Sequence, residues 1–398
     1  MIEIADIREA RARVASILRP TPVEPAESIG KVTGRPVLLK PEHRQLTGSY
    51  KIRGAYNKVS RLAAGEEVVA ASAGNHAQGV ARAARLTGHR ATIFMPETAP
   101  LPKVAATRAD EADIRLVGRV VDETIAAARD YAEQHGAVFV HPFDDPLIIA
   151  GQGTVGLELA EEVEGPAAVV VPVGGGGLIA GVATALAALR PDLVVYGVEA
   201  EGAAAMRASL DAGSVVTLDH IATIADGIAV KAPSALTLEH VRARVADVVT
   251  VPDEEISRAL LLLLERAKAV VEPAGAVGLA AILAGKIPGD GPAVALLSGG
   301  NVDPLLLIKL IEHGLTAAGR YLLLRIVLED RPGALASLTE AVAKLGLNVL
   351  AVEHHRVGLA IGVDKVEVTL TLETRDPEHR DEAVRALRDA GFTVEHLS

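Results

Sequence analysis

The stretch that decides the fold is AAVVVPVGGGGLIAGVATALAALRP, residues 167–191. An apolar run comes first, four glycines follow, and an Ala-rich segment completes it. An apolar run that leads through a short turn into a helical segment is typical of a βαβ unit. Residues 174–177 have no Cβ atoms, so their N–H groups can close around an anion, and the dipole of the following helix favours phosphate there. The stretch therefore predicts an α/β sheet with a phosphate site at Gly174, Gly175, Gly176 and Gly177.

The same alternation continues on both sides of this stretch. One compact series of apolar runs and helical segments begins at Val68, and a second begins near Gly153. We expect two doubly wound α/β domains with a site in the cleft between them. We assign residues 1–47 and 148–318 to the larger domain and residues 48–147 to the smaller one.

The C-terminal part of the chain has a different pattern. After Gly319 the segments read as strand, helix, strand, strand, helix and strand. This order predicts a ferredoxin-like α+β domain over residues 321–398. Its length lies within the range of domains that fold independently.

The composition limits the possible partners. Asp and Glu number 51 against 40 Lys and Arg, and no basic run occurs, so we expect neither nucleic acid nor an anionic membrane as a partner. Cysteine is absent, which excludes disulfides, thiolate metal sites and a Cys nucleophile. The N-terminus predicts an amphipathic helix rather than a signal peptide, and no apolar run reaches the ~20 residues of a membrane span. We therefore expect a soluble, cytoplasmic protein.

A second motif is TGSYKIRG, residues 47–54. Lys51 is placed at the start of a predicted helix, where the helix dipole and partial loss of solvation both lower the pKa of its amine. A neutral lysine amine can form a Schiff base with an aldehyde. The alternative is an ordinary solvated lysine on the surface.

A third motif, SAGNH at residues 72–76, lies between a predicted strand and a predicted helix. The N–H groups at this helix start can bind a carboxylate, and Asn75 can offer its amide to a ring hydroxyl. Ser72 and Asn75 are also common helix N-caps, which is the alternative explanation. We assign His76 no role in proton transfer.

Two further segments lie where α/β proteins bind ligands. Ser298, in the segment SGGN at residues 298–301, follows an apolar strand and is expected on the rim of the sheet, although an ordinary turn is the alternative. Residues 175–180 also fit a relaxed dinucleotide fingerprint, and Glu199 ends the next predicted strand, where a ribose-binding carboxylate is expected. A nicotinamide-dependent oxidoreductase is therefore a competing hypothesis, although it leaves Lys51, Asn75 and Ser298 unexplained.

Residues from about 18 to 315 resemble the fold-type II pyridoxal-phosphate (PLP) family, in its threonine dehydratase and serine racemase branch. The matching segments, in the order of the family, are TGSYKIRGA, ASAGNHAQGVA, DDPLIIAGQGTVGLEL, VPVGGGGLIAG, EPAGA and LSGGN. The resemblance implies that Lys51 carries the cofactor, that Asn75 contacts its ring hydroxyl, that residues 174–177 hold its phosphate and that Ser298 meets the ring nitrogen. The C-terminal segment resembles an ACT-type regulatory domain, through the turn DRPGAL at residues 330–335.

Three positions depart from the family pattern. Tyr50 replaces the usual Phe, a change expected to matter little. Ala73 replaces the Ser that supplies the second acid-base group of the racemases, which favours a dehydratase. Ala205 removes a carboxylate from the cation site of the racemases, so no metal is expected.

The resemblance implies β-elimination of water from L-threonine, and from L-serine, followed by release of 2-oxobutanoate or pyruvate with ammonia. The freed Lys51 amine would remove the α-proton, and the substrate carboxylate would rest on Ser72 and on the N–H groups of Gly74, Asn75 and His76. The alternatives are action on 3-hydroxyaspartate or D-serine, serine racemisation, and a non-catalytic amino-acid sensor. A free amino acid such as isoleucine or valine is the expected effector at the ACT-like domain, whose pairing implies a homo-oligomer, either a dimer or a tetramer.

Overall fold

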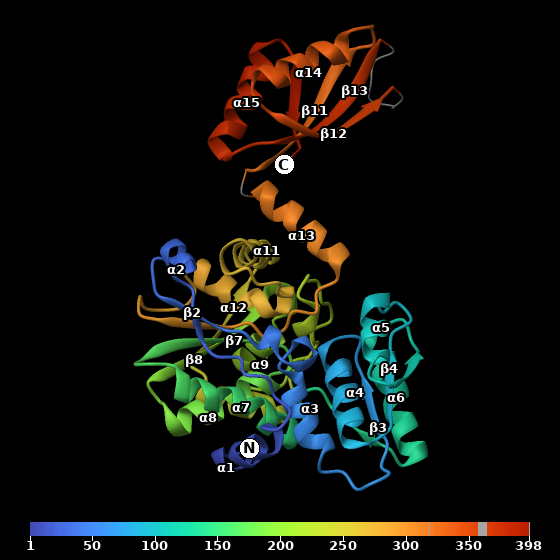
Figure 1. Cartoon of the computed structure of the whole chain (residues 1–398), viewed down its shortest axis with the longest axis vertical. Helices are drawn as coiled ribbons and strands as arrows, with labels where there is room; N and C mark the ends of the chain where they lie inside the picture. The colour runs from blue at the N-terminus through green and yellow to red at the C-terminus, as the bar shows by residue number, and fades with distance from the viewer. Residues whose placement is uncertain (318, 357–363, 398) are drawn as a thin grey trace. The chain divides into compact units, whose positions relative to one another are not determined.

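The computed structural model describes residues 1–317, 319–356 and 364–397 (Figure 1). Its contacts divide the chain into two compact units, Met1–Pro304 and Leu305–Ser398. The first unit contains two sheets, and the second contains one. We describe each unit separately.

The larger sheet of the first unit has six strands in the order β1-β2-β10-β7-β8-β9. Only β1 and β2 pair in antiparallel fashion, and the other neighbours are parallel. The central strands β7 and β10 are buried along their whole length, because helices cover both faces of such a sheet, and this explains their continuous apolar sequences. The strands are β1 (Glu24–Pro25), β2 (Val37–Lys40), β7 (Ala167–Pro172), β8 (Leu193–Ala200), β9 (Asp247–Val251) and β10 (Ala293–Leu296). Its helices are α1 (Ile4–Val14), α2 (Glu27–Thr33), α7 (Pro146–Glu162), α8 (Gly177–Leu189), α9 (Ala205–Ala212), α10 (Ala235–Arg244), α11 (Asp253–Leu262) and α12 (Pro273–Leu283).

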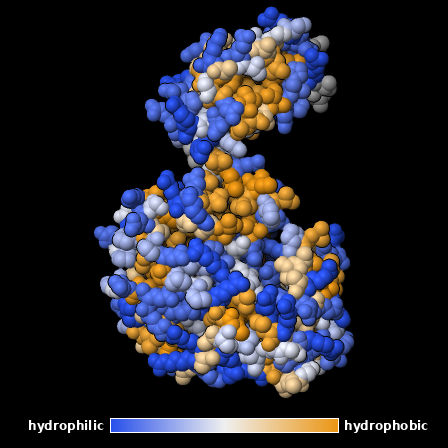
Figure 2. All heavy atoms as spheres, viewed as in Figure 1, coloured by the Kyte–Doolittle hydropathy of each residue, from blue (hydrophilic) through white to orange (hydrophobic). Residues whose placement is uncertain are grey.

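The smaller sheet of the first unit has four parallel strands in the order β5-β4-β3-β6. Its strands are β3 (Val68–Ala71), β4 (Ala91–Met95), β5 (Asp113–Leu116) and β6 (Val138–Phe139). Its helices are α3 (Lys51–Val59), α4 (Asn75–Thr87), α5 (Leu101–Arg108) and α6 (Val121–His135). Figure 2 shows apolar surface near α5, where Leu101 is 80% exposed.

Glycines let α3 and α7 approach closely. A Cβ atom added at Gly151 of α7 would lie 2.5 Å from the Cα atom of Gly54 on α3 and 2.6 Å from the carbonyl oxygen of Arg53. Any larger residue at position 151 would therefore push the two backbones apart. This contact fixes α3, which begins at Lys51, against the helix that leads back into the larger sheet.

The second unit begins with α13 (Pro304–Ala317) and contains an antiparallel sheet in the order β12-β13-β11-β14. Its elements are β11 (Tyr321–Glu329), α14 (Ala334–Lys344), β12 (Asn348–His355), β13 (Lys365–Glu373), α15 (Pro377–Asp389) and β14 (Thr393–His396). Alternate residues of β11 are buried, as expected for a sheet with helices on one face. The predicted element order and the α/β class of the first unit are both confirmed. None of the described helices is long and apolar enough to cross a bilayer.

Candidate active site

The motifs predicted from the sequence meet where strands of the first unit end. Tyr50 donates from its backbone N–H to the carbonyl oxygen of Ser298 at 3.2 Å, and Gly300 donates to the carbonyl oxygen of Gly48 at 2.9 Å. Asn301 donates from Nδ2 to Oδ1 of Asn75 at 2.7 Å. The segments around residues 48–51, 75 and 298–301 therefore form one site, although more than two hundred residues separate the first from the last.

Lys51 and the glycine loop approach each other through the segment at residues 142–143. The Nζ atom of Lys51 donates to the carbonyl oxygen of Pro142 at 3.2 Å. The ring of the next residue, Phe143, packs so closely on Gly175 that a Cβ atom there would overlap the ring. The amine and the predicted phosphate site thus lie on either side of one short segment.

The environment of Lys51 favours the neutral amine. Burial lowers its pKa to about 8, and the nearby carboxylate of Glu272 opposes this shift only in part. A neutral amine is the form that attacks an aldehyde. Lys51 begins α3, as the sequence predicted, so the helix dipole acts in the same direction.

The glycine loop connects the end of β7 to the start of α8. Gly176 has a φ of +88°, a conformation that glycine adopts without strain, and Thr237 donates to the carbonyl oxygen of Gly175 at 2.7 Å. The first N–H groups of a helix have no partner within it, so those of α8 are available to an anion. Added Cβ atoms would clash with Ile228 at Gly174 and with Met206 at Gly176, so the loop's tight packing also requires glycine.

The amide of Asn75 is held from both sides. Its Nδ2 donates to Oε1 of Glu272 at 2.5 Å, and its Oδ1 accepts from Asn301, which also donates to the carbonyl oxygen of Thr47 at 2.8 Å. An amide nitrogen carries two hydrogens, so one N–H remains for a ligand. The orientation of Asn75 is therefore set by residues from two other segments.

Glu272 is a site residue to which the sequence analysis gave no role. It precedes α12 and is 4% exposed, and burial raises the pKa of its carboxyl to about 7, with repulsion from Asp226 as a further cause. The signal available in the sequence was its place in the segment EPAGA, an acidic residue directly before a proline at a helix start. Asn301 was quoted only as part of SGGN, and it too received no role.

The remaining residues of the third motif surround the start of α4. Ser72 accepts at Oγ from the N–H of Gly74 at 3.1 Å, and a Cβ atom at Gly74 would meet open space. His76 is buried, with Nε2 2.8 Å from the carbonyl oxygen of Val140, and burial lowers its pKa to about 3. His76 is therefore a packed imidazole whose pKa favours the neutral form.

Glu199 is not available as a ribose-binding carboxylate. Its two oxygens accept from the backbone N–H groups of Met206 and Arg207, each at 2.8 Å, and the side chain is fully buried. It therefore satisfies N–H groups of the first turn of α9, which otherwise have no partner. The competing dinucleotide hypothesis loses the acidic residue on which it depended.

The two sheets, the glycine loop and the half-buried Lys51 define the class of the protein. The chain belongs to the pyridoxal-phosphate-dependent enzyme family, whose model matches residues 14–299, and an ACT domain matches residues 322–392. The predicted cofactor and the predicted regulatory-type domain are both confirmed.

Two relatives that match the chain along its whole length are L-threonine ammonia-lyases. The chain is 46% identical over 398 residues to that of Thermotoga maritima, covering 99% of both chains. It is 45% identical over 401 residues to that of Geobacter sulfurreducens, covering 100% of both.

Among solved structures, the chain resembles a threonine deaminase of T.th., with a TM-score of 0.72 and 42% identity over 76% of this chain and 99% of that one. It also resembles a maize serine racemase, with a TM-score of 0.74 and 37% identity over 79% of this chain and 98% of that one. One of these structures is of a deaminase and the other of a racemase, the two activities between which the sequence pattern left a choice.

Proposed function

We propose that this chain is an L-threonine ammonia-lyase. It would eliminate water from L-threonine, and hydrolysis of the resulting enamine would release ammonia and 2-oxobutanoate; L-serine would give pyruvate and ammonia in the same way. The observation that carries the proposal is the half-buried Lys51 amine, which lies 3.2 Å from the carbonyl oxygen of Pro142, whose neighbour Phe143 packs on the glycine loop. The two full-length relatives support the choice of substrate.

The described residues fit PLP. The glycine loop offers N–H groups without Cβ atoms to a phosphate, and Lys51 offers an amine with a lowered pKa to an aldehyde. In the proposed assignment, residues 174–177 hold the phosphate, Asn75 donates to the ring hydroxyl and Ser298 bonds to the ring nitrogen. When bound, PLP supplies an electron sink for the carbon that loses its proton.

The chain's own groups then perform the remaining steps. The Lys51 amine would remove the α-proton of the substrate. The substrate carboxylate rests on Ser72 and on the N–H groups of Gly74, Asn75 and His76. Burial lowers the pKa of Lys51 to about 8, so a larger share of its amine is neutral near pH 7 than in an exposed lysine.

Elimination is favoured over racemisation because position 73 is an alanine. A racemase needs a second acid-base group to return a proton to the opposite face, and Ala73 has none. Loss of the β-hydroxyl requires no such group. A chiral assay of serine incubated with the enzyme would show pyruvate without D-serine.

Substrate choice among hydroxy-amino acids is open to direct test. An enzyme for 3-hydroxyaspartate needs a cation for the second carboxylate of the substrate. Lys103 of α5 is close enough to Glu272 for its charge to act there, but Lys103 already pairs with Asp226 at 2.5 Å. We therefore expect the highest kcat/KM with threonine, lower with serine and lowest with hydroxyaspartate. Keto-acid release from each substrate measures this order.

The test of Lys51 compares two variants of the same helix. Lys51→Ala should lose keto-acid formation and the visible absorbance of the bound cofactor. Lys58→Ala is the control, because Lys58 also lies on α3 but pairs with Asp145. A coloured, active Lys51→Ala enzyme would contradict the assignment.

We also propose the domain limits and the regulation. Residues 1–47 and 148–318 would form the larger catalytic domain, residues 48–147 the smaller one, and residues 321–398 the regulatory domain of a cytoplasmic dimer or tetramer. An aliphatic amino acid such as isoleucine or valine would bind between paired ACT domains and change activity. Calorimetry with both amino acids, repeated on a chain ending at residue 317, tests whether binding depends on that domain.

A further inference from the structure

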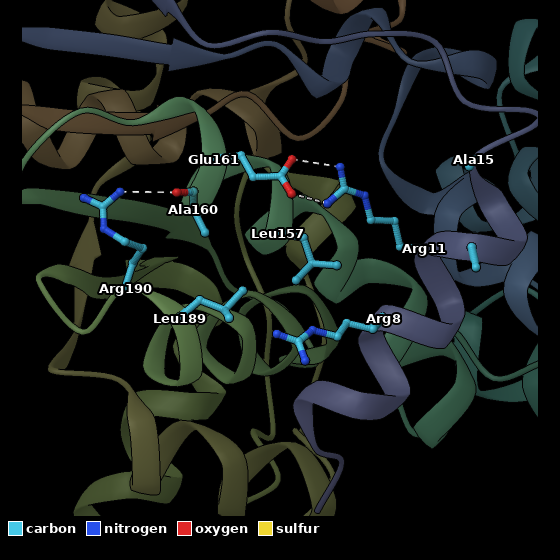
Figure 3. Close-up of a pocket in the computed structure, with 9 residues that line it drawn as sticks. Arg8, Arg11, Ala15, Leu157, Ala160, Glu161, Leu189 and Arg190 are labelled. Atoms are coloured by element: carbon cyan, nitrogen blue, oxygen red, sulfur yellow. Dashed lines mark hydrogen bonds and ion pairs between the residues drawn. The ribbon is translucent and has the colours of Figure 1, made fainter.

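A surface cavity of about 600 Å³ lies between α1, α7 and the end of α8. Figure 3 shows its lining residues, none of which belongs to the candidate active site. Its walls carry three arginines, Arg8, Arg11 and Arg190, and one carboxylate, Glu161. This excess of positive charge is unexpected in a chain with a net charge of −11.

Two of the three arginines are already neutralised. Arg11 donates to both oxygens of Glu161, with Nη2 to Oε2 at 2.8 Å. Arg190 binds Asp192 at 2.7 Å and donates to carbonyl oxygens, among them that of Val163 at 2.9 Å. Arg190 therefore ties the end of α8 to the end of α7 and is not free for a ligand.

Arg8 is exposed and has no counter-ion. Within the parts of the chain that the structure describes, its guanidinium makes neither a hydrogen bond nor an ion pair. Its neighbours three and four positions away on α1 are Ile4, Ala5, Arg11 and Ala12, none of them acidic. Arg11, three residues along the same helix, is paired with Glu161, so Arg8 has a like-charged neighbour and no anion of its own among the described residues.

The floor of the cavity is apolar. Leu157 of α7 and Leu189 of α8 form it, with alanines of α1 and α7 beside them. In Figure 3 the guanidinium of Arg8 reaches from α1 toward these two leucines. Small-molecule sites combine an apolar lining with a few polar groups that orient the ligand, and this cavity has both.

We propose that this cavity binds a short aliphatic carboxylate. The carboxylate pairs with Arg8, whose planar guanidinium group matches its two oxygens, and the aliphatic chain lies on Leu157 and Leu189. Aliphatic 2-oxo acids and aliphatic amino acids share this chemistry. An amino acid would in addition bring its ammonium group toward Glu161.

The test uses the full-length holoenzyme and calorimetric titration with butanoate, which has neither a keto nor an amino group. Arg8→Glu should weaken butanoate binding at least tenfold, because it reverses the charge that meets the carboxylate. Arg13→Glu is the matched control: Arg13 lies on the same helix but pairs with Glu9 and does not line the cavity. The control should bind butanoate as the wild type does.

The apolar half of the site has its own test. Leu189→Asn should weaken binding of butanoate more than binding of acetate, because only the longer chain reaches the floor. Titrations with 2-oxobutanoate and with isoleucine then distinguish the two natural sources of the same chemistry. Neither Arg8→Glu nor Leu189→Asn should change keto-acid formation from saturating threonine without added carboxylate, so this test is independent of the proposed function.

Three results would overturn the proposal. One is the absence of butanoate binding to the wild type at millimolar concentration. Another is unchanged binding in Arg8→Glu. The third is binding of inorganic phosphate as strong as that of butanoate and equally sensitive to Arg8→Glu, which would leave the apolar floor without a role.

Discussion

Asn75 donates from Nδ2 to the buried carboxylate of Glu272 at 2.5 Å. Asn301 completes the arrangement by donating to Oδ1 of the same amide at 2.7 Å. An asparagine amide can rotate to exchange its oxygen and nitrogen, and these two partners allow only one orientation. The chain thus fixes in advance which group Asn75 presents to a ligand, which in the proposed assignment is the ring hydroxyl of PLP.

The first prediction concerns this fixed orientation. Asn301→Ala should raise the Kd for PLP about tenfold, the equivalent of one net hydrogen bond of about 1.4 kcal/mol. The reason is that Asn75 loses the donor that holds its oxygen away from the ring hydroxyl. Fluorescence titration of the cofactor-free protein measures Kd.

A control separates positioning from general destabilisation. Asn348→Ala removes an asparagine of the second unit that pairs with Glu373 at 3.3 Å, and it should leave the Kd for PLP unchanged. The melting temperature of both variants is measured alongside. Equal affinity for PLP in Asn301→Ala and the wild type would show that Asn301 has no positioning role.

The second prediction concerns the titration of Lys51. Its pKa is lowered to about 8 by burial, so the neutral, reactive amine becomes the major form above that pH in the cofactor-free protein. The rate of PLP incorporation should therefore rise with pH and reach half its maximum near pH 8. An unperturbed lysine would place this midpoint near 10.4. Stopped-flow absorbance between pH 6 and 10 would distinguish the two values.

The fold followed from local patterns, but much of the site did not. The strands and helices around residues 167–191 were predictable because burial on both faces of a sheet leaves a continuous apolar run, and the glycine loop because only glycine fits its turn. Glu272 and Asn301 could not be given roles, because their partner Asn75 lies 197 and 226 residues away in the sequence. For Glu199, the position at the end of a strand suggested a contact with a ligand. In the structure its two oxygens instead accept hydrogen bonds from backbone N–H groups of α9.

The third prediction concerns a buried ion pair next to the reactive lysine. Arg53 and Glu42 are both fully buried, with Nη2 and Oε1 2.8 Å apart, and Arg53 also binds Glu158 at 2.6 Å. Arg53→Met should lower the free energy of unfolding by about 3–5 kcal/mol, because it leaves the buried carboxylate of Glu42 without a counter-ion. Urea denaturation of the holoenzyme measures the change.

Two further variants make this prediction specific. Arg53→Met combined with Glu42→Gln should recover part of the loss, since the unpaired charge is gone. Arg61→Met removes a more exposed arginine that pairs with Glu9 at 3.0 Å, and it should cost about 1 kcal/mol or less. A double variant as unstable as the sum of the two single variants would show that the pair does not act as a unit.

The last prediction concerns the pH dependence of stability. Burial raises the pKa of Glu199 to about 7, so folding favours its neutral form. An acid with a raised pKa in the folded state stabilises the fold below its unfolded pKa, and this contribution is lost as the pH rises through the folded value. The loss should occur between about pH 4.5 and 7 and amount to about 3 kcal/mol at most, at about 1.4 kcal/mol per pH unit. Glu199→Gln cannot ionise, so its free energy of unfolding should fall less over this range than that of the wild type. Glu239→Gln, at an exposed position of α10, should follow the wild type, and parallel curves for all three proteins would contradict the prediction.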